Sequence, residues 1–241
     1  MWLNNIMKKT FKQFLLEIQD IQNSVSYQKN IKLPDSASNK TIRHIKNITN
    51  NPKVIPKGSG SQGYVYQHDD PNKQGEVVRV SDKYEATTIY LRYLYDNPEL
   101  QNNPFFPKIK QAIRPNSDVP SYVIEQLYDV VDSPIGFNML HTLIKKYFTT
   151  HQTLAKYEMS DYYFVTSIFA EIIEDSIKFN DYKEIKDPQL KQACQIINKL
   201  YVDLLRKDPA TRVDIHNGNI MWRITKFGPQ LVITDPLWFN K

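Results

Sequence analysis

The stretch RVDIHNGNIMW (residues 212–222), followed after a short turn by LVITDP (residues 231–236), decides the expected fold of this chain. It contains a carboxylate at Asp214, an amide five residues later at Asn219, and a second carboxylate at Asp235. Two apolar runs separate these polar residues, and the Gly-Pro pair between the runs is typical of a turn. The pattern predicts a β-hairpin that carries Asp235 back toward Asp214. Carboxylate and amide oxygens are ligands that suit Mg²⁺.

A glycine-rich segment, KGSGSQGYVY, lies far upstream at residues 57–66 and holds three of the chain's 7 glycines. Glycine lets backbone amides approach a phosphate because no Cβ stands in the way. A dinucleotide-binding fingerprint needs a strand before the loop and a helix after it, whereas here the strand-like run Tyr-Val-Tyr follows the third glycine directly. The segment predicts a hairpin over phosphates, with an ordinary glycine-rich hairpin as the alternative. The loop residues expected at the nucleotide are Gly58, Ser59, Gly60, Ser61 and Gly63.

Together these segments resemble kinase-like phosphotransferases. The run Asp214–Asn219 is similar to the D-x-H-x-x-N catalytic loop of the aminoglycoside phosphotransferase branch, and Ile233–Pro236 resembles the metal-binding D-F-G element with Pro in place of Phe. The fuller pattern is similar to the early serine/threonine protein kinases of lytic podophages. The resemblance implies that Asp214 accepts the proton of the attacking hydroxyl while Asn219 and Asp235 hold Mg²⁺ beside ATP. His216 would orient Asp214 or touch a phosphate, with a structural imidazole as the alternative.

The strand Glu76–Val80 stands where this family places the lysine that anchors the phosphates, but the chain has Arg79 there. Arginine keeps the charge and can bond two phosphate oxygens, although its geometry differs from that of an ammonium group. The alternative is that Arg79 is a solvated strand charge. A helix is expected from Asp82 to Asp96. Its Glu85 would either pair with Arg79 or close the first turn as part of a capping box, which is the preferred interpretation.

The expected fold class is α+β, in the compact two-lobed form of the kinase-like fold. Residues 1–50 form a helical N-terminal extension, residues 51–127 a small antiparallel N-lobe, and residues 128–241 a helical C-lobe. Glu125 and Leu127 fall where the resemblance implies a hinge, whose backbone amide and carbonyl would read the adenine edge. Apolar residues at intervals of three and four predict helices in the C-lobe. These helices are expected at Phe137–Phe148, Ser160–Phe179 and Pro188–Arg206.

The resemblance covers residues 54–241. Only six residues follow Asp235, whereas protein kinases continue into an activation segment and further helices that bind a peptide. The resemblance therefore implies a C-lobe truncated after the metal-binding Asp. The acceptor would be held by the N-terminal extension or by the C-lobe helices. No acidic cluster is evident near the catalytic loop in the sequence, which disfavours a small cationic acceptor.

Composition sets the remaining expectations. The mean hydropathy is −0.53 and no apolar stretch of about 18 residues occurs, so no membrane span is expected. The single cysteine, Cys194, cannot form an internal disulfide, which favours a reducing cytoplasm; it is expected to be a buried small residue. The net charge is +5. Basic residues between positions 40 and 53 predict a solvated face, with a docking surface for an acidic protein or nucleic acid as the alternative.

The leading hypothesis is Mg-ATP-dependent phosphotransfer to serine or threonine hydroxyls of host proteins, in the cytoplasm of a bacterial host. Three alternatives stay open. The chain could be a catalytically weak kinase-like protein that inhibits a host target by binding, with Arg79 and the truncated end of the C-lobe as its support. It could be a small-molecule phosphotransferase, or it could transfer a nucleotide instead of a phosphate.

Overall fold

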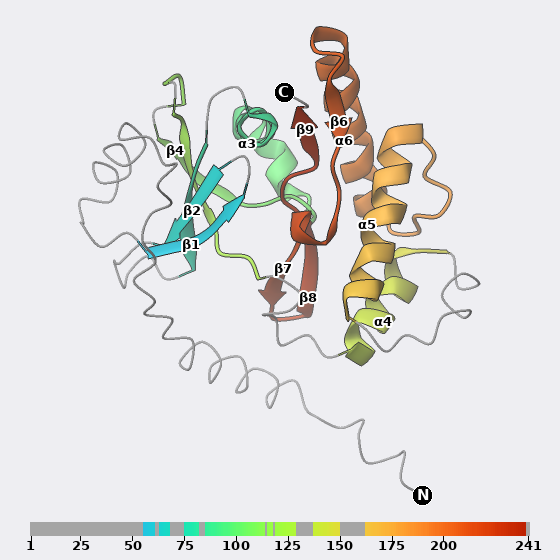
Figure 1. Cartoon of the computed structure of the whole chain (residues 1–241). Coiled ribbons are helices and arrows are strands. Elements are labelled where there is room, and N and C mark those ends of the chain that lie inside the picture. Colours follow the sequence, from blue (N-terminus) through green and yellow to red (C-terminus); the bar gives the residue numbers. More distant parts are fainter. Residues whose placement is uncertain are drawn as a thin grey trace, which may run out of the picture.

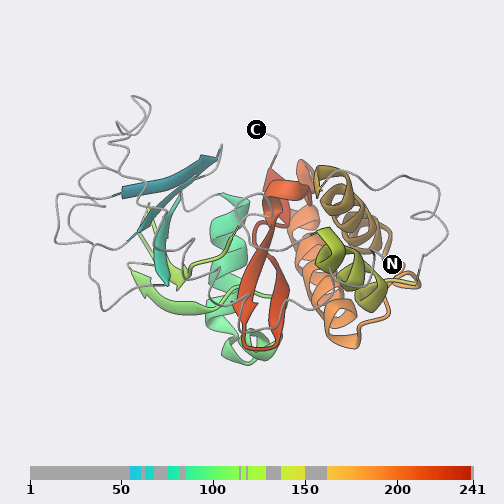
Figure 2. The ribbon, with the colours of Figure 1, turned by 90° about the horizontal axis from the view of Figure 1, so that it is seen from below.

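The computed structural model describes residues 55–60, 63–67, 75–81, 85–113, 115–117, 119–128, 137–149 and 162–239. The expected helical extension and the basic residues at 40–53 lie outside this part of the chain. The fold is mixed α+β, as predicted. Figures 1 and 2 show a small sheet at one side and a group of helices at the other, with one helix and a β-hairpin between them.

Five antiparallel strands form the sheet, in the order β1-β2-β3-β5-β4. The glycine-rich segment forms its edge hairpin, in which Gly60 pairs with Gly63. This hairpin adjoins β3, and the register places Val65 opposite Arg79. The strands are β1 (Ile55–Gly60), β2 (Gly63–Gln67), β3 (Glu76–Val80), β4 (Ile109–Ile113) and β5 (Ser121–Glu125).

Helix α3 (Ala86–Asp96) and the short 3₁₀ helix η2 (Pro98–Asn102) connect β3 to β4. Ala86, Tyr90 and Leu94 are fully buried, and their four-residue spacing gives the helix one apolar stripe. Figure 2 shows α3 between the sheet and the β7–β8 hairpin.

The predicted start of this helix needs a correction. Helix α3 begins at Ala86, so Glu85 stands at the N-cap position, with no side-chain capping hydrogen bond. A capping box requires its glutamate at the third helical position, from which the side chain reaches back to the cap. Glu85 precedes the first turn, so the capping-box interpretation was wrong.

Three helices make up the opposite side of the molecule: α4 (Phe137–Tyr147), α5 (Tyr162–Phe179) and α6 (Pro188–Lys207). Asp187 caps α6, since its carboxylate accepts hydrogen bonds from the amides of Gln189 and Leu190 at 2.9 and 3.0 Å. Pro188 occupies the first helical position, where its missing N–H costs nothing. The start at Pro188 agrees with the helix expected at Pro188–Arg206. Among the described residues, no helix combines the length and apolarity needed to span a bilayer.

Two short ribbons fill the space between α3 and the helices. Strand β7 (Ile220–Thr225) pairs with β8 (Gly228–Ile233), and β6 (Thr211–Val213) pairs with β9 (Leu237–Phe239). Gly228 has a φ of +107°, a conformation that suits glycine in the tight turn of the β7–β8 hairpin. The 3₁₀ turn η4 (Asn217–Asn219) lies between β6 and β7.

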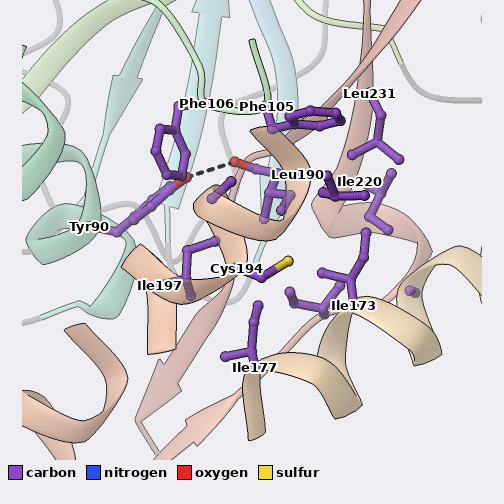
Figure 3. Packing of buried hydrophobic residues seen from close by; sticks show 14 of the residues in the cluster. Tyr90, Phe105, Phe106, Ile173, Ile177, Leu190, Cys194, Ile197, Ile220 and Leu231 are labelled. Atoms are coloured by element: carbon purple, nitrogen blue, oxygen red, sulfur yellow. Dashed lines mark hydrogen bonds between the residues drawn. The ribbon is translucent and has the colours of Figure 1, made fainter. Parts of the chain in front are cut away.

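The hydrophobic core joins α3, α5, α6 and the β7–β8 hairpin (Figure 3). Trp222 is fully buried, and Phe169 contacts its ring edge-on with centroids 6.0 Å apart. The Tyr90 hydroxyl donates to the Ile233 carbonyl at 2.9 Å, which ties α3 to the end of β8. Cys194 is fully buried, and burial raises the pKa of its thiol well above the usual range. Cys194 is therefore an unreactive residue of the core, as the sequence predicted.

Candidate active site

The loop from Asp214 to Asn219 is fixed at both ends against the segment around Asp235. At one end, the Asp214 amide donates to the Pro236 carbonyl at 2.9 Å. At the other end, the amide and hydroxyl of Thr234 donate to the Asn219 carbonyl at 3.0 and 3.1 Å. The β6–β9 and β7–β8 pairings continue outward from these contacts. The backbone thus brings Asp214, Asn219 and Asp235 together at the junction of the two ribbons.

The Asn219 side chain is oriented by Asp214. Its Nδ2 donates to the Asp214 main-chain carbonyl at 2.6 Å and lies 3.5 Å from Oδ2 of the same residue. Asn219 is 8% exposed, so this bond is largely shielded from water. Because the nitrogen is used by Asp214, the amide oxygen is the atom left to bind a cation.

His216 stabilises the turn in this loop. Its Nδ1 accepts a hydrogen bond from the Gly218 amide at 3.1 Å and so caps η4. A Cβ at position 218 would lie 3.0 Å from the imidazole Cε1, so the ring would have to move slightly to accept any other residue there. The other ring nitrogen, Nε2, is 4.0 Å from Asp214 Oδ2, within reach of a weak ion pair but beyond a hydrogen bond. This geometry favours the structural interpretation of His216 over contact with a phosphate.

Arg79 is not a solvated strand charge. Its Nη2 donates to Asp235 Oδ2 at 2.9 Å, and the two side chains are only 17% and 15% exposed. The same nitrogen lies 3.3 Å from the Thr87 hydroxyl, which itself donates to Asp235 Oδ1. Arg79 of β3, Thr87 of α3 and Asp235 therefore form one hydrogen-bonded group, called here the Asp235 triad.

The protonation of Asp235 is balanced by its neighbours. Burial raises the pKa of this carboxyl above its usual value, and the Asp214 carboxylate acts in the same direction. Arg79 and the Thr87 hydroxyl oppose the shift, because both stabilise the ionised form. A carboxylate must be ionised to bind a metal, so the other two members of the triad favour the form that can do so.

In the run after β5, where a hinge was expected, most backbone amides are used within the protein. The Glu125 amide donates to the Lys108 carbonyl at 3.0 Å, whereas the Lys108 amide donates to the Glu125 carboxylate at 2.7 Å. The amides of Gln126 and Tyr128 donate to protein carbonyls at 2.7 and 2.9 Å. Among the described residues of this run, the Leu127 amide is the one that donates to no other described residue.

The Glu125 side chain has a separate role, which the sequence did not indicate. Its carboxylate is held by a forked contact from Arg223 of β7, with Nε donating to Oε2 at 2.6 Å and Nη2 donating to Oε1. Arg223 also donates to the carbonyls of Pro104 and Phe106, both at 2.8 Å. The two charged side chains are 15% and 13% exposed. This largely buried ion pair joins the sheet to the hairpin that ends near Asp235.

Helix α5 brings one acidic side chain, that of Glu174, within electrostatic range of Asp214, although the sequence indicated no acidic cluster near the catalytic loop. The Asn217 side chain donates to the Ser167 hydroxyl at 3.0 Å and so docks the loop on α5. One to two turns further on, α5 carries Glu171, Glu174 and Asp175. Burial raises the pKa of Glu174, Lys178 opposes this, and the carboxylates of Asp175, Asp214 and Glu171 raise it further.

The glycine loop is only partly described. The backbone of Gly58, Ser59, Gly60 and Gly63 forms the β1–β2 hairpin, while Ser61 lies outside the described residues. For metals, no group of three His, Cys, Asp or Glu side chains suited to hold an ion occurs in the described part of the chain. An ion at Asn219 and Asp235 would therefore take much of its coordination from water and phosphate, as Mg²⁺ commonly does.

No protein-family model matches the sequence, and no curated protein matches it either. Among solved structures, the chain is similar to APH(2″)-IIa in its ternary complex with streptomycin and ATP. This match has 11% identity and a TM-score of 0.33, and covers 88% of this chain and 73% of the other. The chain is also similar to the amicoumacin kinase hAmiN in complex with AMP-PNP, Ca²⁺ and Ami. That match has 14% identity and a TM-score of 0.35, over 85% of this chain and 66% of the other.

Sequence reasoning missed three side chains at or beside this site: Thr87, Glu174 and Arg223. Each is a polar residue on a helix or strand whose local pattern is ordinary. Their importance comes from partners far along the chain, such as Asp235 for Thr87 and Glu125 for Arg223. Only the position of Thr87 could have indicated its role. It lies two residues after Glu85, in the helix where the resemblance implies a partner for the cation that anchors the phosphates.

Proposed function

We propose that this protein is an ATP-dependent phosphotransferase that uses a divalent metal ion. The observation that carries the proposal is the arrangement around Asp235. The backbone fixes Asp214 and Asn219 beside it, and Arg79 reaches it from the sheet that also contains the glycine hairpin. With Asp214 as the base, Asn219 and Asp235 as oxygen ligands and Arg79 as the cation, these residues would supply the groups that phosphoryl transfer requires.

Arg79 is suited to hold phosphate oxygens. Its Nε is buried and has no hydrogen-bond partner among the described residues, so this guanidinium has a donor left over. An unpaired buried donor is costly, and a turn of the side chain toward an anionic ligand would satisfy it. The pairing of Val65 with Arg79 places the glycine hairpin directly beside this residue. The nucleotide base would lie at the Glu125 carbonyl and the Leu127 amide.

The oxygens of Asn219 and Asp235 fit a hard divalent cation such as Mg²⁺. Each carboxylate oxygen of Asp235 accepts one hydrogen bond within the triad and keeps a further lone pair. When bound, the ion would neutralise charge on the phosphates of ATP. Asn219 and Asp235 would hold it, and the bond from Asn219 Nδ2 to the Asp214 carbonyl keeps the ligating oxygen oriented.

Asp214 is suited to act on the acceptor. Its side chain is 41% exposed, so an incoming hydroxyl can reach the carboxylate. Its amide is fixed by Pro236, and its carbonyl holds Asn219. The carboxylate would accept the hydroxyl proton as the new O–P bond forms and the terminal phosphate leaves ADP. His216 supports this indirectly by capping the turn of the same loop.

For the acceptor, our first proposal is a serine or threonine hydroxyl of a host protein. It rests on the resemblance of Asp214–Asn219 and Ile233–Pro236 to the early kinases of lytic podophages. With that acceptor the protein would act in the cytoplasm of an infected bacterium and redirect host functions. The exposure of Asp214 is compatible with a large substrate.

A small cationic molecule is the second candidate, and the acidic residues of α5 favour it. Glu174 interacts electrostatically with Asp214, so a negative field extends from the proposed base onto the helix. Such a field attracts amines. A hydroxyl on an aminated small molecule would then be delivered to Asp214.

Labelled nucleotides separate these acceptors. The purified chain is incubated with Mg²⁺ and γ-labelled ATP, together with a bacterial lysate, a panel of polyamines and amino sugars, or no acceptor.

For a protein kinase, we expect label on serine or threonine of lysate proteins, with Glu174→Gln as active as wild type. For a small-molecule kinase, label enters the amino sugars and Glu174→Gln transfers several-fold less, whereas Glu99→Gln on η2 does not. A parallel reaction with α-labelled ATP detects nucleotide transfer. Absence of label from every acceptor, with no nucleotide binding, would refute the proposal.

Arg79 provides a second test, on nucleotide binding. Arg79→Ala is expected to weaken binding of Mg·AMP-PNP roughly tenfold, the scale of one lost hydrogen bond to a charged group. Arg79→Lys should retain most of the affinity, because an ammonium also serves phosphates. Calorimetric titration measures all three proteins. The matched control is Arg212→Ala, which removes an exposed arginine from β6. Equal affinities in all forms would show that Arg79 serves only the ion pair with Asp235.

A further inference from the structure

Thr87 contacts both charged members of the Asp235 triad. Its hydroxyl donates to Asp235 Oδ1 and stands 3.3 Å from Arg79 Nη2, from which it can accept. A threonine hydroxyl has one hydrogen and two lone pairs, so one group serves both neighbours at once. Arg79 holds the other carboxylate oxygen, Oδ2. The two oxygens of Asp235 are thus held from two different elements, β3 and α3.

Burial makes the Thr87 hydroxyl hard to replace. Thr87 is fully buried, so water has no access from which to take over its hydrogen bond. A carboxylate that loses a buried donor keeps the full cost of its desolvation. The hydroxyl is therefore the donor on which Oδ1 of Asp235 depends.

Helix α3 is held rigidly enough to position this hydroxyl. The next residue, Thr88, is buried and hydrogen-bonds to Ser81 at the end of β3. One turn later, Tyr90 donates to the Ile233 carbonyl, two residues before Asp235. The first turn of α3 is thus fastened to both segments that carry Arg79 and Asp235.

From this geometry we propose that Thr87 is the positioning residue that keeps the Asp235 carboxylate oriented for its metal ion. The inference rests on the proposed function. If Arg79 turns toward nucleotide phosphates, Oδ2 of Asp235 loses its partner in the triad. The Thr87 hydroxyl has no such second task, and it continues to hold Oδ1. A short polar side chain on α3 thereby maintains the ligand while the arginine serves the nucleotide.

The test separates metal-dependent from metal-independent nucleotide binding. Calorimetric titration with AMP-PNP is done in Mg²⁺ and again in a chelator, for wild type, Thr87→Val and Thr87→Ser. In Thr87→Val the volume is kept and the hydroxyl is lost. We expect the gain in affinity from Mg²⁺ to fall roughly tenfold, the scale of one hydrogen bond to a charge, while affinity in chelator stays unchanged. Thr87→Ser restores the hydroxyl and should restore the gain.

Thr88→Val is the matched control, since it removes a neighbouring buried hydroxyl that bonds Ser81 and does not touch Asp235. If Thr87 has only a structural role, Thr87→Val lowers AMP-PNP affinity equally with and without Mg²⁺, and that result overturns the inference. The inference is also overturned if Mg²⁺ raises the AMP-PNP affinity of Thr87→Val as much as it raises that of wild type. If Thr87→Val does not fold, Thr87→Ala is compared with Thr87→Ser in the same way. A wild-type chain that binds no AMP-PNP in either condition would instead refute the proposed function, and this inference with it.

Discussion

Replacing Asp214 with asparagine is expected to lower phosphate transfer at least about a hundredfold, because general-base catalysis typically contributes about 10²- to 10⁴-fold. The substitution keeps the volume of the side chain and removes the group that accepts the hydroxyl proton. The contacts that shape the loop come from the main chain of residue 214, namely its amide to Pro236 and its carbonyl to Asn219. Folding and Mg·AMP-PNP affinity should therefore stay near wild-type values. Initial rates with γ-labelled ATP measure the effect.

Asp203→Asn is the matched control, since Asp203 is an exposed carboxylate of α6 whose partner is Arg206. Its transfer rate should equal that of wild type. The same pair of variants decides between enzyme and binding protein in host cells. If phosphate transfer is the function, the effect of the protein on host cells disappears with Asp214→Asn and persists with Asp203→Asn. An Asp214→Asn protein that keeps the full effect in cells would favour the hypothesis of a catalytically weak protein that inhibits by binding.

The arrangement of the ribbons could be predicted because its signals are local. Apolar runs on both sides of a Gly-Pro turn predicted the β7–β8 hairpin, and the hairpin necessarily returns Asp235 toward the loop that holds Asp214. The start of α6 was equally local, since Asp187 and Pro188 specify a cap and a first helical residue within two positions. Both predictions depended on periodicity and turn chemistry within about 25 residues.

The polar contacts of the site could not be predicted in this way. Thr87 and Asp235 are 148 positions apart, and Arg223 and Glu125 are 98 apart. Nothing in the helix pattern around Thr87 distinguishes its hydroxyl from that of Thr88. The start of α3 also failed, because Glu85 fits the local capping pattern while the helix begins one residue after it. Partners brought together by tertiary packing leave no periodic trace in the sequence.

Helix α5 illustrates the same limit for charge. Glu171, Glu174 and Asp175 occupy ordinary polar positions of an amphipathic helix. Only the docking of α5 on the loop, seen in the bond from Asn217 to Ser167, makes Glu174 a neighbour of Asp214. The sequence indicated no acidic cluster near the catalytic loop because this neighbour of Asp214 comes from another helix, and Glu174 supports the alternative of a cationic acceptor.

The second large effect concerns stability. Arg223→Met is expected to lower the free energy of unfolding by about 3 kcal/mol, the lower end of the cost of removing one partner from a buried ion pair, because this pair keeps some exposure to solvent. The Glu125 carboxylate would stay buried without its fork, and the carbonyls of Pro104 and Phe106 would lose their donors. For a chain of this size the melting temperature should fall by roughly 10 °C. Thermal and denaturant unfolding followed by circular dichroism measure both quantities.

Two comparisons show whether the cost comes from the uncompensated charge. Arg206→Met removes an arginine whose partnership with Asp203 is exposed, and such pairs contribute about 0–1 kcal/mol. The double variant Arg223→Met with Glu125→Gln removes the charge as well as its partner, so it should recover part of the lost stability. Because Glu125 also begins the proposed hinge, Arg223→Met should in addition weaken AMP-PNP binding at temperatures where the protein is still folded. If the single and double variants are equally unstable, the loss comes from the carbonyls of Pro104 and Phe106, and the ion pair itself contributes little.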